Sequence, residues 1–509
     1  MNHHSTSHAG EQNPVQSAKL ENFTEEIGKL RPNGNPLIAH KFGADPYALV
    51  FNNRVYLYMT SDKLEYDMDG TPQKNSYSSI NRITVISSDD LINWTDHGEI
   101  RVAGPQGAAK WASQSWAPAA AHRIIEGEDC FFLYFANNAS GIGVLSAPTP
   151  VGPWVDPIGK ALVTRETPGV EEVTWLFDPA VFVDDDHQAY LYFGGGIPEG
   201  KAERPDTARV MRLGDDMISV VGKAKVIPAP YMFEDSGIHK YNHIYYYTYC
   251  SNFDKGDRPE GSPPAGEIAY MTSIQPMGPW TYQGTILQNP GHFFGIGGNN
   301  HHAIFQLADQ WYIAYHAQTL CQAMNIPEGY RSTHLNRIEH DEASGRIKKV
   351  HADYQGVDQI KCFDPYQRVT GSTIGWSSGV STEQYHDAVE ISAEVSAADS
   401  NVISAKLKSD SWIAISNVDF DREGPAIFTA ILANQGTEGT LELRLDRTDG
   451  PLIGEMIVSS TTGSLHWMER TTEITGAQGV HNLYIMLKGS TDSSTILLRE
   501  WKFNRKDEV

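Results

Sequence analysis

Hydrophobic and polar positions follow one pattern five times along the first two thirds of the chain. In each copy a polar residue precedes a short apolar run, a turn, and then a strand dense in aromatic residues. The first copy runs from Asp45 through residues 47–50 to the aromatic run 55–58. The lead residues of the five copies are Asp45, Trp116, Asp178, Glu234 and His301. Self-similarity at this spacing, roughly 55 to 70 residues, indicates an architectural repeat.

Each copy predicts a β-hairpin, because two strand-like runs flank turn residues such as Asn52 and Asn53. A further motif that ends in tryptophan, at Trp94, Trp154 and Trp280, follows several of the hairpins and leads into another strand. The full unit therefore reads as about four strands. Four-stranded units repeated around an axis are the blades of a β-propeller, so the pattern predicts a five-bladed propeller.

The pattern changes from Phe363 onward, where short runs of alternating apolar and polar residues are separated by Gly, Asp and Ser turns. Such alternation predicts a β-sandwich of the jelly-roll kind. The predicted fold is thus all-β. It has a polar N-terminal extension at 1–29, a five-bladed propeller at 30–355 and a sandwich at 363–509.

Charge and composition narrow the range of partners. The chain has 40 basic and 63 acidic residues and a formal net charge of −23, so it repels polyanions, and neither nucleic acid nor an anionic membrane is expected to bind it. No apolar stretch approaches the roughly 18 residues that span a bilayer. Residues 1–8 lack the apolar core of a signal peptide, and the four scattered cysteines read as free thiols. These features predict a cytoplasmic location.

The five lead residues are predicted to converge, because the innermost strand of every blade runs along the propeller axis. The ring of lead residues would contain three carboxylates, the indole of Trp116 and an imidazole. Carboxylates at a few ångströms from one another are electrostatically unfavourable, and such an arrangement is typical of functional sites. Each residue also has a plain structural explanation, since Asp before Pro is a common turn opener and Trp116 could be ordinary core. The matching repeat positions favour the functional interpretation.

Three carboxylates with several aromatic residues suit glycoside hydrolysis, in which one acid protonates the leaving oxygen and one carboxylate activates water. The sequence shows no phosphate-binding Gly-rich loop, no serine nucleophile elbow and no cysteine nucleophile context. It has no His/Cys cluster with zinc spacing. A different class of protein, a non-catalytic glycan-binding propeller, is disfavoured because a lectin does not need three converging carboxylates.

At these residues the chain closely resembles glycoside hydrolase family 43 over roughly residues 30 to 350. The family consists of five-bladed propeller enzymes that cleave arabinose or xylose linkages with inversion. The resemblance implies that Asp45 is the general base, that Asp178 modulates the pKa of the acid and orients it, and that Glu234 is the general acid. Inversion requires the carboxyl groups of Asp45 and Glu234 to lie roughly 6.5 to 9.5 Å apart.

The same resemblance implies further contacts around the ring. Trp116 matches a sugar-lining tryptophan and Arg331 matches an arginine near the substrate hydroxyls. His301, rather than His302, matches the histidine that holds a largely hydrated Ca²⁺ ion in the axial channel. Adjacent side chains of a strand point to opposite faces, so only one of these two histidines is expected to face the axis.

Residues 298–305 and 312–319 are most similar to the arabinoxylan arabinofuranohydrolases of the family. We therefore expect an α-L-arabinofuranosidase that acts on arabinoxylan or arabinoxylo-oligosaccharides, with a β-xylosidase acting on xylo-oligosaccharides as the alternative. A retaining fructan enzyme would place its acid before a cysteine, whereas Glu234 precedes Asp235. The linkage position, the preference for singly or doubly substituted xylose and the oligomeric state stay open.

The tail resembles a family 6 carbohydrate-binding module, but it departs from that family where sugar would bind. Ile415 and Ser464 stand where aromatic residues of the binding cleft are usual, and residues 369–373 lack the usual acidic calcium ligands. We expect a structural role, with this part packed against the propeller.

Overall fold

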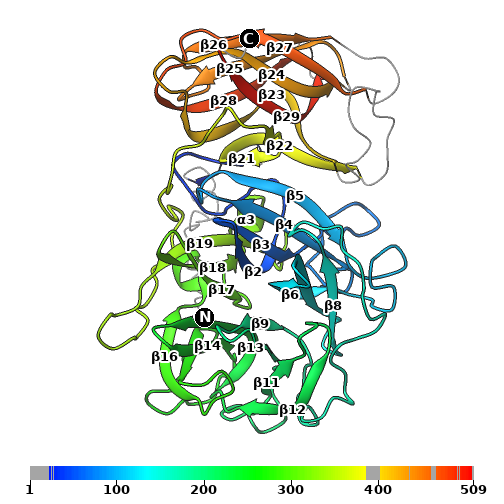
Figure 1. Ribbon diagram of the computed structural model, residues 1–509, viewed down its shortest axis with the longest axis vertical. Helices are drawn as coiled ribbons and strands as arrows, with labels where there is room; N and C mark the ends of the chain where they lie inside the picture. The colour runs from blue at the N-terminus through cyan, green and yellow to red at the C-terminus, as the bar shows by residue number, and fades with distance from the viewer. Residues whose placement is uncertain are drawn as a thin grey trace, which may run out of the picture.

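The computed structural model describes residues 22, 23, 26, 28–385, 402–434, 436–459, 466–489, 491 and 493–506. Most of the predicted N-terminal extension, and Ser464, lie outside the described residues. The predicted all-β fold is confirmed, with a five-bladed propeller below and a sandwich above (Figure 1). The two helices of the described part, α2 (Pro290–Phe294) and α3 (Thr319–Ala323), are short.

The five blades follow one another along the chain as antiparallel sheets. Blade one contains β2 (Ala44–Phe51), β3 (Arg54–Thr60), β4 (Arg82–Ser88) and β5 (Trp94–Arg101). Blade two contains β6 (Trp116–Ile125), β7 (Glu128–Ala136) and β8 (Ile142–Ala147), and blade three contains β9 (Ala180–Val183), β10 (Ala189–Phe193), β11 (Ala208–Leu213) and β12 (Val220–Ile227). Blade four contains β13 (Met232–Tyr241), β14 (Ile244–Ser251), β15 (Ile268–Ser273) and β16 (Thr281–Leu287), and blade five contains β17 (His302–Leu307), β18 (Gln310–Ala317) and β19 (Ser332–Ile338). Blades two and five thus have three described strands instead of the expected four.

The tight turns between inner and second strands follow from local sequence. In blade one, Phe51 pairs with Arg54, and the two loop residues Asn52 and Asn53 have φ of 50° and 57°. Two positive φ angles define a type I′ turn, whose twist matches that of the strands, and asparagine tolerates this conformation well. Blades four and five have the same two-residue loop between their first two strands.

Tyrosines of the aromatic second strands connect each of blades one to four to the following blade. Each hydroxyl donates to a backbone carbonyl of the following blade: Tyr58 to Pro150 (2.6 Å), Tyr134 to Met217 (2.7 Å), Tyr192 to Pro276 (2.7 Å) and Tyr246 to Gly345 (2.7 Å). Pro150 and Pro276 belong to the recurring tryptophan motif, so this motif receives the bond of the preceding blade. Side by side, the inner strands form a closed ring in the order β2, β6, β9, β13, β17.

The sandwich is built around one long strand, β23 (Val402–Asp419). Its residues 412–419 pair with β28 (Val480–Gly489) and its residues 405–408 pair with β29 (Thr495–Arg505), so it takes part in both layers. The other strands are β20 (Val369–Thr370), β22 (Trp376–Tyr385), β24 (Pro425–Asn434), β25 (Gly439–Leu445), β26 (Leu452–Val458) and β27 (Met468–Glu473). Trp501, Phe428 and Phe503 are buried between the layers.

The propeller and the sandwich exchange short strands at their junction (Figure 1). β21 (Thr373–Ile374) pairs with β5 of blade one, and β1 (Gly28–Lys29) pairs with β22 of the sandwich. A buried carboxylate of blade one, Asp96, accepts hydrogen bonds from Lys41 and from Thr382 of the sandwich. The two parts are therefore joined by backbone pairing as well as by side chains.

One layer of the sandwich turns its aromatic residues toward the propeller. Trp376, Trp412 and Tyr484 form a cluster with Ile92 of blade one, and the Trp376 indole donates to the carbonyl of Asn33. Ile415 is fully buried, so it offers no surface to a sugar. These contacts agree with the expected packing of the tail on the propeller. Within the described part of the chain, no helix is long and apolar enough to cross a bilayer, and the cytoplasmic location stays a prediction.

Candidate active site

One cavity at the propeller axis brings together all of the residues singled out from the sequence. It has a volume of about 280 Å³. Its walls include Asp45, Trp116, Asp178, Glu234, His301 and Arg331. Every blade contributes at least one of these side chains, and each comes from the beginning of an inner strand, from the residues just before one, or, for Arg331, from the residue before β19.

Irregular backbone at the starts of the inner strands directs these side chains into the cavity. The strand register shifts beside Asp45, Trp116 and Glu234. Asp45 and Asp178 have left-handed φ angles of 47° and 48°, and Ala117 and Asp235, which follow Trp116 and Glu234, have 39° and 71°. A β-bulge bends a strand and changes the direction of a side chain. Such irregular backbone explains why the lead residues, at the beginnings of otherwise regular strands, point into the cavity.

The Asp45 carboxylate is held through one of its two oxygens. Oδ1 accepts a hydrogen bond from Arg331 Nη1 at 2.7 Å and lies 3.2 Å from His316 Nδ1. His301 Nδ1 lies 3.6 Å from the same oxygen. Burial by itself would raise the pKa of Asp45, but Arg331, His316 and His301 outweigh it and hold the pKa well below its ordinary value. Asp45 is therefore ionised, and these three contacts all involve Oδ1.

Arg331 is itself fixed by a carboxylate that the sequence did not point to. Asp62 Oδ2 accepts from the Arg331 backbone N–H and from Nε, both at 2.9 Å, and Oδ1 accepts from Nη2 at 2.8 Å. The Tyr77 ring packs against the guanidinium, with the central carbon 5.0 Å from the ring centre. Asp62 thus occupies one edge of the guanidinium, and a single nitrogen, Nη1, reaches Asp45.

Glu234 and Asp178 have the opposite electrostatic character to Asp45. Burial raises the pKa of Glu234 well above its ordinary value, and the charges of Asp178 and Asp45 raise it further. Burial, followed by the charge of Asp45, likewise raises the pKa of Asp178, which accepts a 2.9 Å hydrogen bond from the Asp235 backbone. Glu234 Oε1 is buried and has no hydrogen-bond partner among the described residues. One carboxyl is therefore kept ionised and another is kept protonated, the division of roles that acid–base chemistry needs.

His301 and His302 line different cavities, although both contact the carboxylate of Asp235. His301 lines the cavity and its Nε2 lies 3.1 Å from Asp235 Oδ1, whereas His302 Nε2 lies 2.8 Å from Thr248 Oγ1 and lines a second cavity. Burial lowers the pKa of His301. Ca²⁺ takes six to eight oxygen ligands. No group of three or more His, Cys, Asp or Glu side chains in the described ranges is arranged to hold a metal ion, so His301 could bind Ca²⁺ only with water as most of its ligands.

Aromatic residues that the sequence reasoning missed make up much of the cavity wall. The Trp116 indole donates to the Tyr77 carbonyl at 3.1 Å, which fixes the orientation of its ring. Trp175 also lines the cavity, and from it a row of rings leads outward, with centroid distances of 5.2 Å to Phe233 and 5.5 Å from Phe233 to Phe253. Phe253 is 40% exposed. Such rings can stack on sugar faces both in the cavity and beside it.

Asp62, Tyr77 and His316 were missed for one reason. Asp62 and Tyr77 come from the loop after β3, outside the repeated strands, and His316 lies in β18, whereas none of the other second strands has a histidine. The repeat is the signal that identified the lead residues, and it carries no information about residues that occur once.

Comparison with known proteins identifies both parts of the chain. The family model of glycosyl hydrolases family 43 matches residues 34–344, and that of carbohydrate binding module family 6 matches residues 370–505. The chain is 50% identical to an arabinoxylan arabinofuranohydrolase of Paenibacillus polymyxa, over 94% of this chain and 75% of that one. It is also 50% identical to an arabinoxylan arabinofuranohydrolase of Bacillus subtilis (strain 168), over 94% of each chain. A crystal structure of a family 43 arabinoxylan arabinofuranohydrolase from Bacillus subtilis, in complex with cellotetraose, superimposes with a TM-score of 0.90 at 48% identity, covering 94% of this chain and 99% of that one.

Proposed function

We propose that this chain, which belongs to glycoside hydrolase family 43 and is a glycosidase, releases α-L-arabinofuranosyl side groups from arabinoxylan or arabinoxylo-oligosaccharides. The observation that carries the proposal is the 50% identity to two arabinoxylan arabinofuranohydrolases over 94% of this chain. Because the similarity extends through the sandwich, it reaches beyond the motifs that the whole family shares.

The size of the cavity supports removal of single side groups. At about 280 Å³ it lies at the lower end of ligand pockets, which range over roughly 300 to 1,000 Å³. One sugar unit suits this volume better than a length of polymer. The ring row from Trp175 to the exposed Phe253 would then lie under the xylose units that carry the side group.

In the proposed reaction Glu234 and Asp45 act on opposite sides of the bond that breaks. Protonated Glu234 donates its proton to the glycosidic oxygen as the bond from that oxygen to the anomeric carbon breaks. Asp45, through Oδ2, takes a proton from the water molecule that attacks this carbon. Burial, together with the neighbouring carboxyl groups of Asp178 and Asp45, keeps Glu234 protonated until that moment. Attack by water in a single displacement inverts the configuration, and the corresponding carboxyl separation of roughly 6.5 to 9.5 Å stays a prediction.

Trp116 would stack on the released sugar and Arg331 would reach its hydroxyl groups, while holding Asp45 in place. A Ca²⁺ ion held by His301 and water also stays a prediction. Bound there, it would add positive charge beneath the sugar, and no step of the proposed reaction depends on it.

The test is to incubate the protein separately with arabinoxylo-oligosaccharides and with unbranched xylo-oligosaccharides and to identify the released monosaccharide. We expect arabinose from the first substrate and nothing from the second. Release of xylose alone would contradict the proposal and support the β-xylosidase alternative. A Glu234→Gln protein in parallel shows that the activity belongs to this site, because the amide cannot donate the proton.

A further inference from the structure

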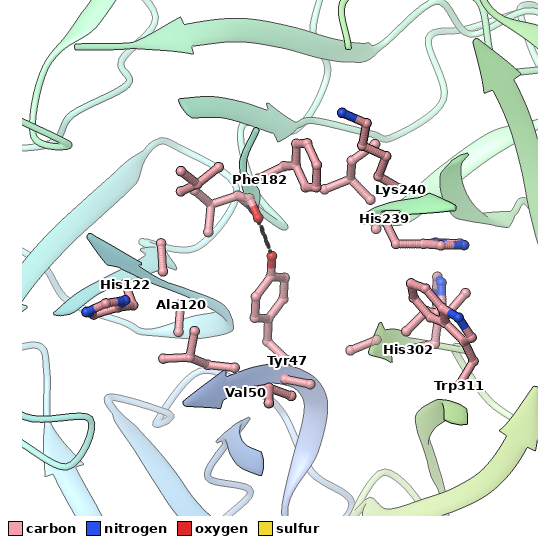
Figure 2. A pocket seen from close by; sticks show the side chains of 18 of the residues that line it. Tyr47, Val50, Ala120, His122, Phe182, His239, Lys240, His302 and Trp311 are labelled. Carbon is pink, nitrogen blue, oxygen red and sulfur yellow. Dashed lines mark hydrogen bonds between the residues drawn. The ribbon is translucent and has the colours of Figure 1, made fainter. Parts of the chain in front are cut away.

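One partly buried tyrosine of the propeller makes a connection of a different kind from all the blade-to-blade contacts described above. Tyr47 extends from β2 of blade one, its hydroxyl donates to the Val181 carbonyl at 2.7 Å, and the hydroxyl accepts from the Val181 N–H at 3.1 Å. Val181 belongs to β9 of blade three, and in the ring of inner strands β6 lies between β2 and β9. Figure 2 shows the Tyr47 ring in the middle of a cavity, with its hydroxyl reaching the strand that carries Phe182. The tyrosine therefore crosses the axis.

The surroundings of Tyr47 make this bridge stiff. Its ring packs against the apolar clusters between blades one and two, blades two and three, and blades three and four. Burial raises the pKa of Tyr47 to about 12, so the hydroxyl keeps its proton and continues to donate to Val181. Both backbone groups of Val181 are engaged, which fixes the direction of approach as well as the distance.

Both ends of the bridge adjoin lead carboxylates. Asp45 precedes Tyr47 with only Pro46 between them, and Asp178 precedes Val181 with Pro179 and Ala180 between them. Each link is only one or two residues long, and the proline in it fixes its own φ angle. The links therefore have little freedom to absorb a displacement. A shift at either end of the bridge is thus passed on to a carboxylate of the active site.

The bridge joins the two strands that carry neighbouring carboxyl groups. His301 Nδ1 lies 3.6 Å from Asp45 Oδ1 and 3.9 Å from Asp178 Oδ2. Whenever both carboxyl groups are ionised they repel each other, and this repulsion acts to move β2 away from β9. The two hydrogen bonds of Tyr47 join these strands directly.

We propose that Tyr47 is a positioning residue that acts as a cross-axis strut and sets the separation of Asp45 and Asp178. The strut lies below the active-site cavity and inside a second, larger cavity of about 680 Å³, and the two cavities have no lining residue in common. Tyr47 has no place in the wall of the active site, so it affects the reaction through Asp45 and Asp178 and not by contact with the sugar.

The first experiment compares Tyr47→Phe with Tyr58→Phe on an aryl α-L-arabinofuranoside and on arabinoxylo-oligosaccharides. Both substitutions keep the ring and remove a buried tyrosine hydroxyl, but Tyr58 joins neighbouring blades. We expect similar losses of melting temperature in the two variants. For Tyr47→Phe we expect kcat to fall roughly tenfold with KM within about twofold, because a small displacement of a catalytic group is costly, and for Tyr58→Phe we expect kcat within about twofold of the parent. Equal kcat values in the two variants would overturn the proposal.

The second experiment places Tyr47→Phe in an Asp45→Asn background. The strut acts on the separation of Asp45 and Asp178, and once residue 45 can no longer accept a proton that separation has no catalytic consequence, so the residual rate of the double variant equals that of Asp45→Asn. A further tenfold loss of the residual rate in this background would show that the Tyr47→Phe substitution acts elsewhere. That result would contradict the role of Tyr47 as a strut. The inference rests on the proposed function, and the two failures are distinguishable: a parent protein that releases no arabinose contradicts the proposed function, whereas an active parent with independent effects contradicts only the strut.

Discussion

The propeller axis has a cavity at each end, and the two differ in size and in the pairing of their charges. The active-site cavity has about 280 Å³ and holds Asp45, Asp178 and Glu234 around one guanidinium, which Asp62 shares. The cavity at the other end has about 680 Å³. The charges at its rim are paired, since Lys240 Nζ lies 2.7 Å from Asp184 and 2.8 Å from Asp185.

The larger cavity is not the proposed active site. The pairing of charges, and not the volume of a cavity, therefore distinguishes the end of the axis where the reaction is proposed to occur. The same five inner strands build both cavities, the first from the beginnings of the strands and the second from residues farther along them. Burial by itself would raise the pKa of Asp184, but hydrogen bonds from Lys240 and Tyr245 outweigh it and hold the pKa below its ordinary value. The side chain of Asp185 is 82% exposed. At the active site a single guanidinium cannot neutralise all of the carboxylates, and burial then leaves Glu234 protonated.

The largest expected effect comes from removing the acid. Glu234→Gln keeps the shape of the side chain but cannot donate a proton, so we expect kcat on arabinoxylo-oligosaccharides to fall by roughly 10²- to 10⁴-fold. Steady-state kinetics measure the effect. A variant that keeps more than a tenth of the parent kcat would show that Glu234 is not the acid.

The next largest effect is expected from removing the charge of Asp62, which shares the guanidinium of Arg331 with Asp45. In Asp62→Asn the guanidinium loses its charged partner on one edge and is free to turn both of its terminal nitrogens to Asp45. We expect kcat to fall by about ten- to a hundredfold, because Asp45 Oδ2 then becomes engaged and a small displacement at the reacting centre is costly. Asp96→Asn is the matched control, since Asp96 is a buried, lysine-paired carboxylate at the junction with the sandwich. It should lower stability and leave kcat within about twofold, and an equal loss of kcat would contradict the role of Asp62.

A smaller effect is expected on stability as a function of pH. The folded-state pKa of Glu234 is raised above its ordinary value of 4.5, so above that pH the unfolded chain releases a proton that the folded protein keeps. Folding is therefore favoured at low pH, and this contribution is lost as the pH rises toward the folded-state pKa. Glu234→Gln has no carboxyl group to titrate, so it does not lose stability in this way as the pH rises. We expect its melting temperature to exceed that of the parent by a margin that grows above pH 4.5, and a margin independent of pH would contradict burial as the cause.

The smallest effect is expected at the opposite end of the axis. Lys240→Met removes the cation of a partly exposed ion pair, so we expect the free energy of unfolding to fall by less than about 1 kcal/mol. The kcat should stay within about twofold of the parent, since no proposed step involves this cavity. A tenfold loss of kcat would show that the two cavities are functionally linked and that the comparison between them fails.

Much of the fold and of the cavity was predictable because each lead residue sits at the same point of a repeated unit. Asp45, Trp116, Asp178, Glu234 and His301 line one cavity, as a propeller built from those units requires. The assignment of base, modulator and acid among them stays a proposal. The type I′ turn at Asn52 and Asn53 also follows from local sequence, since it depends only on the conformations that those two residues tolerate.

Other features could not be read from the chain. Asp62 meets Arg331 across 269 positions of sequence, and Tyr47 meets Val181 across 134. The exchange of β1 and β21 between the two parts is of the same kind, because short strands pair where an edge is available and not where their own sequence demands it.

The sequence by itself determined where strands and turns form and which residue leads each blade, because these depend on side-chain alternation and on local backbone preferences. The tertiary structure decided which charges meet. One guanidinium is divided between Asp45 and Asp62, Oε1 of Glu234 is buried without a hydrogen-bond partner among the described residues, and Tyr47 spans the axis. Those outcomes depend on distances between segments far apart in the chain, and electrostatic and hydrogen-bond energies are set by such distances and by burial.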